Sequence, residues 1–219
     1  MSSAKRRKSL PSPAERRRRN REEVINAILD TSRENIRENG AAGLNLNEVA
    51  RQLGMKTPSL YEYFPNKMAI YEALFRLGIR LFHERIEHNP GKDVSLWQRV
   101  RFTMDTYLTF AHENPELYQI VFERPVPGFV PSEEGVNECI AALAYLIDGL
   151  SQAKATGQIR TALTAEQAYY LMSGMMHGLT ALHIANEPQL PVGEGRFGSM
   201  MPAAVALFRA AWETDPSDR

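Results

Sequence analysis

Apolar side chains recur every three or four residues along most of the chain, which is the spacing of an amphipathic helix. The first such stripe follows Pro13 and stops at Gly40, a residue typical of helix ends. Its inward positions are Ile25, Ile28, Leu29, Ser32 and Ile36. The sequence shows no pair of strands with alternating polarity and no repeat of fixed length. The pattern therefore predicts an all-α protein.

A short helix is predicted over residues 45–53, and a turn follows it. Asn45 and Glu48 have the spacing of a capping box, in which Asn45 accepts backbone N–H groups and Glu48 reaches back to the start of the helix. Gly54 then permits the chain to turn tightly.

A second short helix, residues 58–64, follows this turn. Thr57 is expected to cap it, and Pro58 fits its first position, where no amide donor is needed. Pro65 ends it. Two short helices joined by a glycine turn, behind a longer supporting helix, are typical of a helix-turn-helix, here residues 45–64. The second helix of such a motif enters the major groove of DNA.

The rest of the chain is also predicted to be helical. A helix capped by Asn66 carries apolar residues on one side, and a capping box of Thr164 and Gln167 opens a later helix. Pro-rich and Gly-rich segments separate several of the helices. The helices expected after residue 90 cover residues 94–113, 115–122, 136–157, 165–187 and 200–212.

The net charge is zero, but the charge is unevenly distributed. Residues 1–70 contain 14 Lys and Arg against 8 Asp and Glu, whereas residues 71–219 contain 12 against 18. Basic clusters occur at residues 5–8 (KRRK) and 15–21 (ERRRRNR). We expect residues 1–19 to form a disordered basic arm, which is compatible with condensation on DNA phosphates.

Composition excludes several classes of protein. No run of about 18 apolar residues is present, so no membrane span is expected. The charged N-terminus has no apolar segment behind it and is not a secretory signal. The single cysteine, Cys139, excludes an internal disulfide and a cysteine-rich metal site, and it is expected to be a small buried apolar residue. We expect a cytoplasmic protein without metal or cofactor.

The segment NLNEVARQLGMKTPSLYEYFPNKMAIYEAL (residues 45–74) resembles the DNA-binding segment of TetR-type transcriptional regulators. It shares their short capped helix, their Gly-centred turn, their aromatic pair ending in Phe and the Lys that opens the fourth helix. Asn45 stands where Thr is common, which preserves the cap. The resemblance covers about residues 20–80 and implies a DNA-binding domain there.

The resemblance also implies individual roles. Tyr61 and Tyr63 would pack over sugar-phosphate or reach base edges, and Lys67 would hold a phosphate at the start of the fourth helix. Residues 57–59 would touch bases. Tyr61 is also compatible with a packing role. The expected DNA-binding residues are Asn45, Lys56, Thr57, Pro58, Ser59, Tyr61, Tyr63 and Lys67.

The second half carries a further resemblance. RPVPGF (residues 124–129) and the His177-Gly178 pair are similar to a TetR C-terminal subtype with a Trp–His-Gly signature, although the Trp is missing and residues 172–176 take its place. Periodicity alone fits core and pocket equally well for the Met and aromatic residues of this half. The resemblance favours a ligand pocket. Its expected lining is Met104, Tyr107, Phe122, Met172, Met176 and His177.

Motifs of catalysis are missing from the sequence, which has no GxGxxG, P-loop or HExxH. His177 and His183 lie six residues apart, on different faces of a helix, which argues against a shared metal. Two alternatives stay open: a helical enzyme with His177 as general base, and a DNA-binding dimer without ligand control.

The sequence as a whole predicts a two-domain, homodimeric repressor. Residues 20–80 would bind a palindromic operator in double-stranded DNA, and residues 81–219 would bind a small apolar effector and dimerise. An apolar patch on the last helix would need the cover of a second copy. The residues expected in that patch are Met200, Met201, Phe208 and Trp212.

Overall fold

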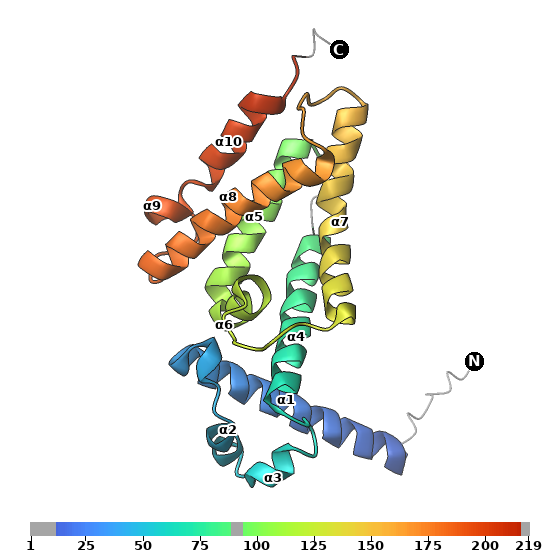
Figure 1. The fold of residues 1–219 in the computed structure, drawn as a ribbon, viewed down its shortest axis with the longest axis vertical. Coiled ribbons are helices and arrows are strands. Elements are labelled where there is room, and N and C mark those ends of the chain that lie inside the picture. Colours follow the sequence, from blue (N-terminus) through green and yellow to red (C-terminus); the bar gives the residue numbers. More distant parts are fainter. Residues whose placement is uncertain (1–11, 89–93, 216–219) are drawn as a thin grey trace, which may run out of the picture. The chain divides into compact units, whose positions relative to one another are not determined.

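A computed structural model describes residues 12–88 and 94–215 of the 219-residue chain. Every regular element in these two ranges is a helix (Figure 1). The β-structure within them is limited to an isolated bridge between Ile159 and Glu213. The prediction of an all-α fold, with an N-terminal helix-turn-helix domain and a C-terminal helical domain, is therefore confirmed.

The chain divides into two compact units, residues 1–70 and 71–219. The sequence predicted the boundary at residue 80. The difference arises in α4 (Lys67–Glu87), whose first turn belongs to the N-terminal unit and whose later turns belong to the C-terminal unit. Because the helix is continuous, its apolar pattern shows no break that would mark the boundary.

The N-terminal unit is built from α1 (Pro13–Asn39), the short 3-10 helix η1 (Ala41–Gly43), α2 (Leu46–Gln52) and α3 (Thr57–Leu60). These elements pack their apolar side chains into one core. Its fully buried members include Ile28, Val49, Leu60 and Ile70.

Helix α1 begins at Pro13, where the helical pattern was predicted to start, so it includes residues 13–19, which were also predicted to belong to the disordered arm. Ser12 Oγ accepts the N–H of Glu15 at 3.2 Å, and Glu15 Oε2 accepts the N–H of Ser12 at 2.6 Å, while Pro13 occupies the first position. This box starts a helix without an apolar face, which the hydrophobic pattern alone does not reveal. Residues 13–19 are therefore helical, and the prediction of a disordered arm was wrong for them. Residues 1–11 lie outside the described residues.

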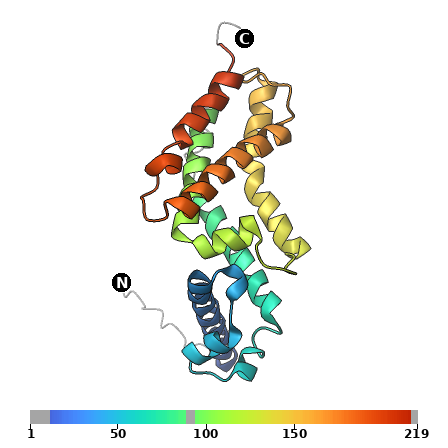
Figure 2. The same cartoon turned by 60° about the vertical axis from the view of Figure 1, so that its left-hand side comes forward.

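The elements of the C-terminal unit after α4 are α5 (Leu96–Glu113), α6 (Pro115–Tyr118), the π-helix η2 (Gln119–Glu123), α7 (Glu133–Ala155), α8 (Ala165–Asn186), α9 (Gly195–Gly198) and α10 (Met201–Trp212). Helix α8 packs against α5, α7, α9 and α10 (Figures 1 and 2). The sequence predicted all of these except α9, and its helix over residues 115–122 covers both α6 and most of η2, without the π form of the latter. Helix α9 is too short to show periodicity, and η2 continues directly from α6.

Local caps start several helices of this unit. Thr164 and Gln167 form the predicted capping box at α8, and Ser95 forms another at α5. Ser132 caps α7 by accepting the N–H of Gly135 at 3.1 Å. Helix α7 therefore begins three residues before its predicted start at residue 136.

The last helix buries most of the apolar patch that the sequence predicted on its surface. Met201, Phe208 and Trp212 are buried, and the Phe208 and Trp212 ring centroids lie 5.0 Å apart. Met200 is exposed. The prediction was wrong for the three buried residues, because α10 packs against α5 and α8 of its own chain.

Candidate DNA-binding motif and ligand cavity

Helix α2, the turn at Gly54 and helix α3 form the helix-turn-helix. Asn45 caps α2 by accepting the N–H groups of Asn47 and Glu48 at 3.1 and 3.4 Å. Glu48 does not complete the predicted box, because its carboxylate pairs with Arg51 at 2.5 Å, which holds the pKa of Glu48 below its usual range. Gly54 has a φ of 65°, in the left-handed region that favours glycine.

Helix α3 is shorter than predicted, and Thr57 is its first residue, not its cap. Thr57 Oγ1 donates to Asn47 Oδ1 at 2.9 Å and so ties α3 to α2. After Leu60 the chain tightens, with the Tyr63 N–H donating to the Leu60 carbonyl at 3.0 Å. The helix predicted over residues 58–64 is thus a single α-helical turn followed by a tighter turn.

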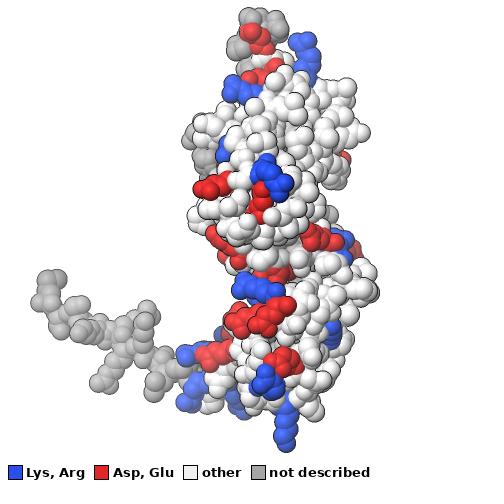
Figure 3. Space-filling view, turned by 90° about the vertical axis from the view of Figure 1, so that its left-hand side faces the viewer, with Lys and Arg blue, Asp and Glu red and all other residues white. Residues whose placement is uncertain are grey.

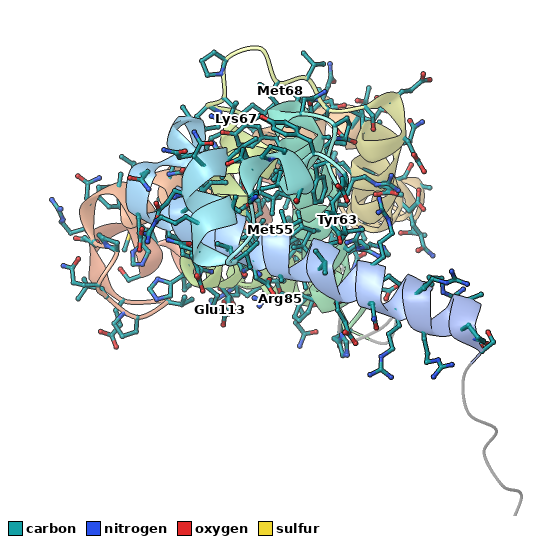
Figure 4. All side chains as sticks on the ribbon, turned by 90° about the horizontal axis from the view of Figure 1, so that it is seen from below. Met55, Tyr63, Lys67, Met68, Arg85 and Glu113 are labelled. Atoms are coloured by element: carbon teal, nitrogen blue, oxygen red, sulfur yellow. The ribbon has the colours of Figure 1, made fainter. Side chains whose placement is uncertain are left out.

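The predicted DNA-binding residues differ in exposure. Tyr61 is 48% exposed, while Leu60 and Phe64 are buried as predicted. Figure 4 shows Tyr63 from the segment after α3 and Lys67 from the start of α4. Asn45, Lys56 and Pro58 are also exposed, and Thr57, Ser59, Tyr63 and Lys67 are partly buried.

Arg21 of α1 holds the segment that follows α3. Its Nη2 donates to the carbonyl oxygen of Glu62 at 3.2 Å, and its guanidinium carbon lies 5.0 Å from the centre of the Tyr63 ring. The second distance is within the range of a cation–π interaction. Because 41 residues separate Arg21 from Glu62, local sequence patterns gave no signal for this contact.

The start of α4 is held in a similar way. Asn66 Oδ1 accepts the N–H of Ala69 at 3.0 Å, as predicted for a cap. Lys67 Nζ donates to the carbonyl of Ala42 at 3.3 Å, so that the Lys67 side chain lies beside η1. Both contacts fix the first turn of α4 within the N-terminal unit.

The first turns of α1 carry five arginines between residues 16 and 21. Arg18 pairs with Glu22 at 3.6 Å and Arg19 with Glu23 at 2.9 Å, and all four side chains are exposed. Figure 3 shows Lys and Arg side chains, with some Asp and Glu, over the N-terminal unit at the foot of that view. Exposed pairs of this kind contribute little to stability, so the arginines stay accessible to an anionic partner.

The C-terminal unit contains a cavity of about 420 Å³. Its walls come from α4, α5, η2, α7 and α8. Four of the six predicted pocket residues line it: Tyr107, Phe122, Met176 and His177. Met104 and Met172 are buried but do not line it. Helical periodicity places a residue on the buried stripe but does not tell which neighbour on that stripe faces a void.

Tyr107 and His177, which line the cavity, meet Tyr118, which does not. The hydroxyls of Tyr107 and Tyr118 lie 2.9 and 3.2 Å from Nδ1 of His177, and they also hydrogen-bond to each other. Burial raises the pKa of both tyrosines, so both stay protonated. The three side chains thus form one hydrogen-bonded cluster.

Arg124 and Cys139 also line the cavity, although the sequence singled out neither for it. Cys139 is half-buried, less than expected; burial raises the pKa of its thiol, and the charge of Arg124 opposes this shift. Arg124 has φ 50° and ψ 51°, the left-handed conformation, at the end of η2. Pro125 was a signal that the helix ends here, but not that Arg124 turns to the left-handed region.

One wall of the cavity packs directly on α4. Val121 of η2 lines the cavity, and a Cβ placed on Gly78 would lie only 2.7 Å from its Cγ2. A glycine therefore allows α4 and η2 to approach this closely. Phe82, one turn further along α4, lines the cavity too, with its ring centroid 5.9 Å from that of Tyr107 and 5.7 Å from that of Phe122.

Helix α7 is tied to α4 by polar groups. The Glu72 carboxylate accepts the N–H of Ser132 at 3.0 Å and also its hydroxyl. Arg76 pairs with Glu138 at 2.6 Å, and Glu138 directly precedes Cys139 in the cavity wall. Two walls of the cavity, η2 and α7, thus contact the same helix.

The described residues contain no group of three or more His, Cys, Asp or Glu arranged to hold a metal ion. His183 is fully buried beside His112, with ring centroids 6.1 Å apart, whereas His177 is bonded to the two tyrosines. No helix within residues 12–88 or 94–215 is long and apolar enough to cross a membrane.

Comparison with known proteins finds a nucleoid occlusion factor and a transcriptional regulator. The nucleoid occlusion factor SlmA of Vibrio cholerae is 29% identical over 101 residues, which are 46% of this chain and 50% of that protein. A transcriptional regulator of Mycobacterium tuberculosis, Rv1816, is 26% identical over 66% of this chain and 63% of its own length. The chain thus spans about half to two thirds of the length of these curated relatives.

The fold is shared with solved regulators. FadR from Bacillus subtilis, in complex with stearoyl-CoA, superposes with a TM-score of 0.65 at 20% identity, over 83% of this chain and 95% of that one. AibR, in complex with isovaleryl coenzyme A and operator DNA, gives a TM-score of 0.63 at 21% identity, over 85% and 97% of the two chains.

Family models match both parts of the molecule. Residues 28–74 match the model of bacterial regulatory proteins of the tetR family. Residues 100–212, more than half of the chain, match that of the tetracyclin repressor-like C-terminal domain. With the helix-turn-helix in the first range and the cavity-bearing bundle in the second, this chain belongs to the TetR family of bacterial regulatory proteins.

Proposed function

We propose that this protein is a sequence-specific DNA-binding repressor that leaves its operator when a small apolar ligand fills the cavity. The observation that carries the proposal is the contact of Val121, in the cavity wall, with Gly78 of α4. The first turn of the same helix belongs to the helix-turn-helix unit. AibR, solved with both a coenzyme A thioester and operator DNA, supports the combination of ligand and DNA binding.

Within this proposal, residues 45–67 read the operator. Pro58 and Ser59 of α3 face bases, while Tyr61 and Tyr63 pack against the sugar-phosphate backbone, as do Lys67 and the arginines of α1. Because the Thr57 hydroxyl donates to Asn47, Thr57 contributes through its methyl group or as an acceptor. Asn45 and Lys56, both exposed, lie at the two ends of the α2-turn segment and complete the surface.

The ligand acts on DNA through α4. A molecule bound between Phe122, Met176 and His177 presses on Val121 and Phe82. Val121 contacts α4, and Phe82 belongs to it. Displacement of this helix moves Lys67 at its start. The two helix-turn-helix motifs of a dimer then no longer have the spacing that fits two successive major grooves of the operator. The coupling free energy expected for such a link is about 1–3 kcal/mol, roughly 5- to 150-fold in affinity.

We infer a homodimer formed through α8 and α10. Leu171 and Leu182 of α8 are 52% and 45% exposed, and Leu207 of α10 is 58% exposed. Four exposed alanines of α10, at positions 203, 206, 210 and 211, lie around Leu207, with the exposed Arg209 also on this helix, so a second copy finds a largely apolar, closely approachable face. A two-fold dimer fits a palindromic operator with half-sites about 34 Å apart, or a multiple of that.

Sedimentation tests the dimer. The wild-type protein is expected to be dimeric at micromolar concentration, and Leu207→Glu, which places a charge in the apolar face, is expected to give a folded monomer. A wild-type monomer would contradict the proposed interface.

The subtype with the Trp–His-Gly signature stays a prediction, supported by the His177-Gly178 pair and by the place of His177 in the cavity. The relative from Mycobacterium tuberculosis is named as a transcriptional regulator, and Nδ1 of His177 meets two phenols where a general base has an orienting carboxylate. We therefore infer a regulator and not an enzyme, acting on DNA in the cytoplasm. Turnover of acyl thioesters that depends on His177 would revive the enzyme alternative.

The proposal is tested with labelled DNA from the region upstream of the protein's own gene. Fluorescence anisotropy is expected to show specific binding that a member of a panel of apolar acids and thioesters reverses. Ser173→Phe, which places a large apolar side chain in the cavity lining, is expected to bind the same DNA but to lose the response. Binding that no ligand changes would leave the alternative of a constitutive DNA-binding dimer.

A further inference from the structure

We propose that the ligand is an apolar chain with an anionic group, and that the guanidinium of Arg124 binds this group at the rim of the cavity. The inference rests on the proposed function, because it names the class of effector that the cavity takes. Its elements are the charge of Arg124, the conformation of Arg124, the apolar walls and the size of the cavity.

Arg124 is the one Lys, Arg, Asp or Glu among the described residues that line the cavity. Its side chain is exposed, so the guanidinium lies where the cavity meets solvent. No carboxylate of the described part of the chain pairs with it. Glu123, its neighbour, is exposed and does not line the cavity. A guanidinium in this position offers paired N–H donors that match a carboxylate or a phosphate.

The backbone of Arg124 supports a functional role. Its φ of 50° is the only positive value at a non-glycine residue among the described residues. This conformation costs an L-residue with a long side chain more than it costs glycine or asparagine. The Arg124 N–H donates to the carbonyl of Gln119 at 2.9 Å, and Pro125 follows, so the chain holds the conformation firmly. Such positions cluster at ligand clamps.

The apolar lining of the cavity suits a hydrocarbon chain. Phe82, Val121, Phe122 and Met176 present apolar surface, and Met adapts readily to chains of different shape. The hydroxyl groups of Tyr107 and Tyr118 are satisfied by His177 and by each other. These polar groups therefore need no charged group of the ligand as a partner, and the anionic group binds to Arg124.

The size of the cavity suits a small ligand. Its volume of about 420 Å³ lies in the range of small-molecule sites, about 300–1,000 Å³. A medium-length acyl chain fits, whereas the large head of a coenzyme A thioester would lie outside, with its phosphates near the rim. The anion at Arg124 is then the carboxylate of a free acid or a phosphate of a thioester.

Calorimetry with three probes of equal chain length separates these cases: decanoate, decanoyl-CoA and neutral 1-decanol. Arg124→Gln removes the charge but keeps a polar, shorter side chain, and Arg124→Lys keeps the charge but not the paired donors. Arg160→Gln serves as the matched control, because Arg160 is exposed in the same unit and does not line the cavity. Thermal unfolding of each variant establishes that it is folded.

We expect Arg124→Gln to weaken the binding of an anionic probe at least tenfold and to leave the affinity for decanol unchanged. The affinity of Arg124→Lys for the anionic probe should lie between those of Arg124→Gln and the wild type. If Arg124→Gln loses affinity for decanoate, the group bound by Arg124 is the carboxylate of a free acid. If it loses affinity for decanoyl-CoA alone, the group is a phosphate of the thioester. Both results support the proposal. Equal binding of all probes to wild type and Arg124→Gln overturns it, while the ligand-binding role of the cavity stands. Failure of every probe, decanol included, to bind the wild type overturns both.

Discussion

The two units of this molecule position their functional residues by different means. In the N-terminal unit, short polar contacts set the reading surface: Thr57 to Asn47, Arg21 to Glu62 and Lys67 to Ala42. In the C-terminal unit, packed rings from separate helices shape a cavity, with Phe82 against Tyr107 and Phe122.

Polar surface contacts and buried rings contribute differently to the stability of the fold. Polar tethers near the surface hold a side chain in place but exclude little water, so each contributes modestly to folding. Buried rings exclude water over a large area and contribute much more. Substitutions in the first unit are therefore expected to change DNA binding without unfolding, and substitutions in the ring cluster to change stability first.

The largest effect is expected for Phe82→Ala. Phe82 is buried and contacts the rings of Tyr107, Phe110 and Phe122. Its removal leaves a cavity next to an existing one, and the free energy of unfolding should fall by about 3–5 kcal/mol. Denaturant unfolding measures this loss, with Tyr61→Ala as the control that changes it by less than about 0.5 kcal/mol. Equal losses for the two would remove the contrast between the units.

Next in size are Tyr61→Ala and Lys67→Ala, which should each weaken operator binding about tenfold, or 1.4 kcal/mol, with an unchanged melting temperature. Tyr61→Phe keeps the ring and separates packing from hydrogen bonding. Lys67→Ala should also lower the slope of log affinity against log salt by about 1 if it binds a phosphate. Wild-type affinity of either alanine variant at physiological salt would show that the proposed register of α3 is wrong.

A smaller effect is expected for Arg21→Lys, which keeps the charge but loses the fork that reaches Glu62 and covers Tyr63. Specific binding should weaken several-fold, while non-specific binding and the salt slope stay as in wild type. Arg16→Gln, on the same helix, is the matched control and should lower the slope by about 0.9 as a lost phosphate contact. If Arg21→Lys also lowers the slope, Arg21 contacts DNA directly and is not a positioning residue.

The smallest effect on base preference is expected for removal of residues 1–11. Up to four phosphate contacts, from the cluster KRRK at residues 5–8, would disappear, so the salt slope should fall by as much as about 3.6 while the base preference stays the same. The deletion must spare Ser12, which caps α1. Anisotropy titrations at several salt concentrations measure the slope, and an unchanged slope would make the arm a passive tail.

The sequence predicted what depends on near neighbours. Asn45, Asn66 and the box of Thr164 and Gln167 were found as caps because each contact spans two or three residues. The helix-turn-helix was predicted from the order of these caps and the glycine turn along the chain. Ser12 with Glu15 belongs to the same class of contact, but no apolar stripe marked that turn as helical.

The sequence could not predict what depends on distant packing. Arg21 and Glu62 are 41 residues apart, and Tyr107 and His177 are 70 residues apart. Met104 and Tyr107 share a buried stripe of α5, yet only Tyr107 lines the cavity. The neighbouring helices decide which residue faces the cavity, and the periodicity of a single helix contains no information about its neighbours.

The central claim is that the cavity and the DNA-binding motif are coupled through α4. The most direct test is calorimetry of an effector with and without saturating operator, because coupling between two sites must act equally in both directions. We predict that operator weakens the ligand by the same factor, roughly 5- to 150-fold, by which the ligand weakens the operator. Equal ligand affinities in the presence and absence of operator would contradict the account.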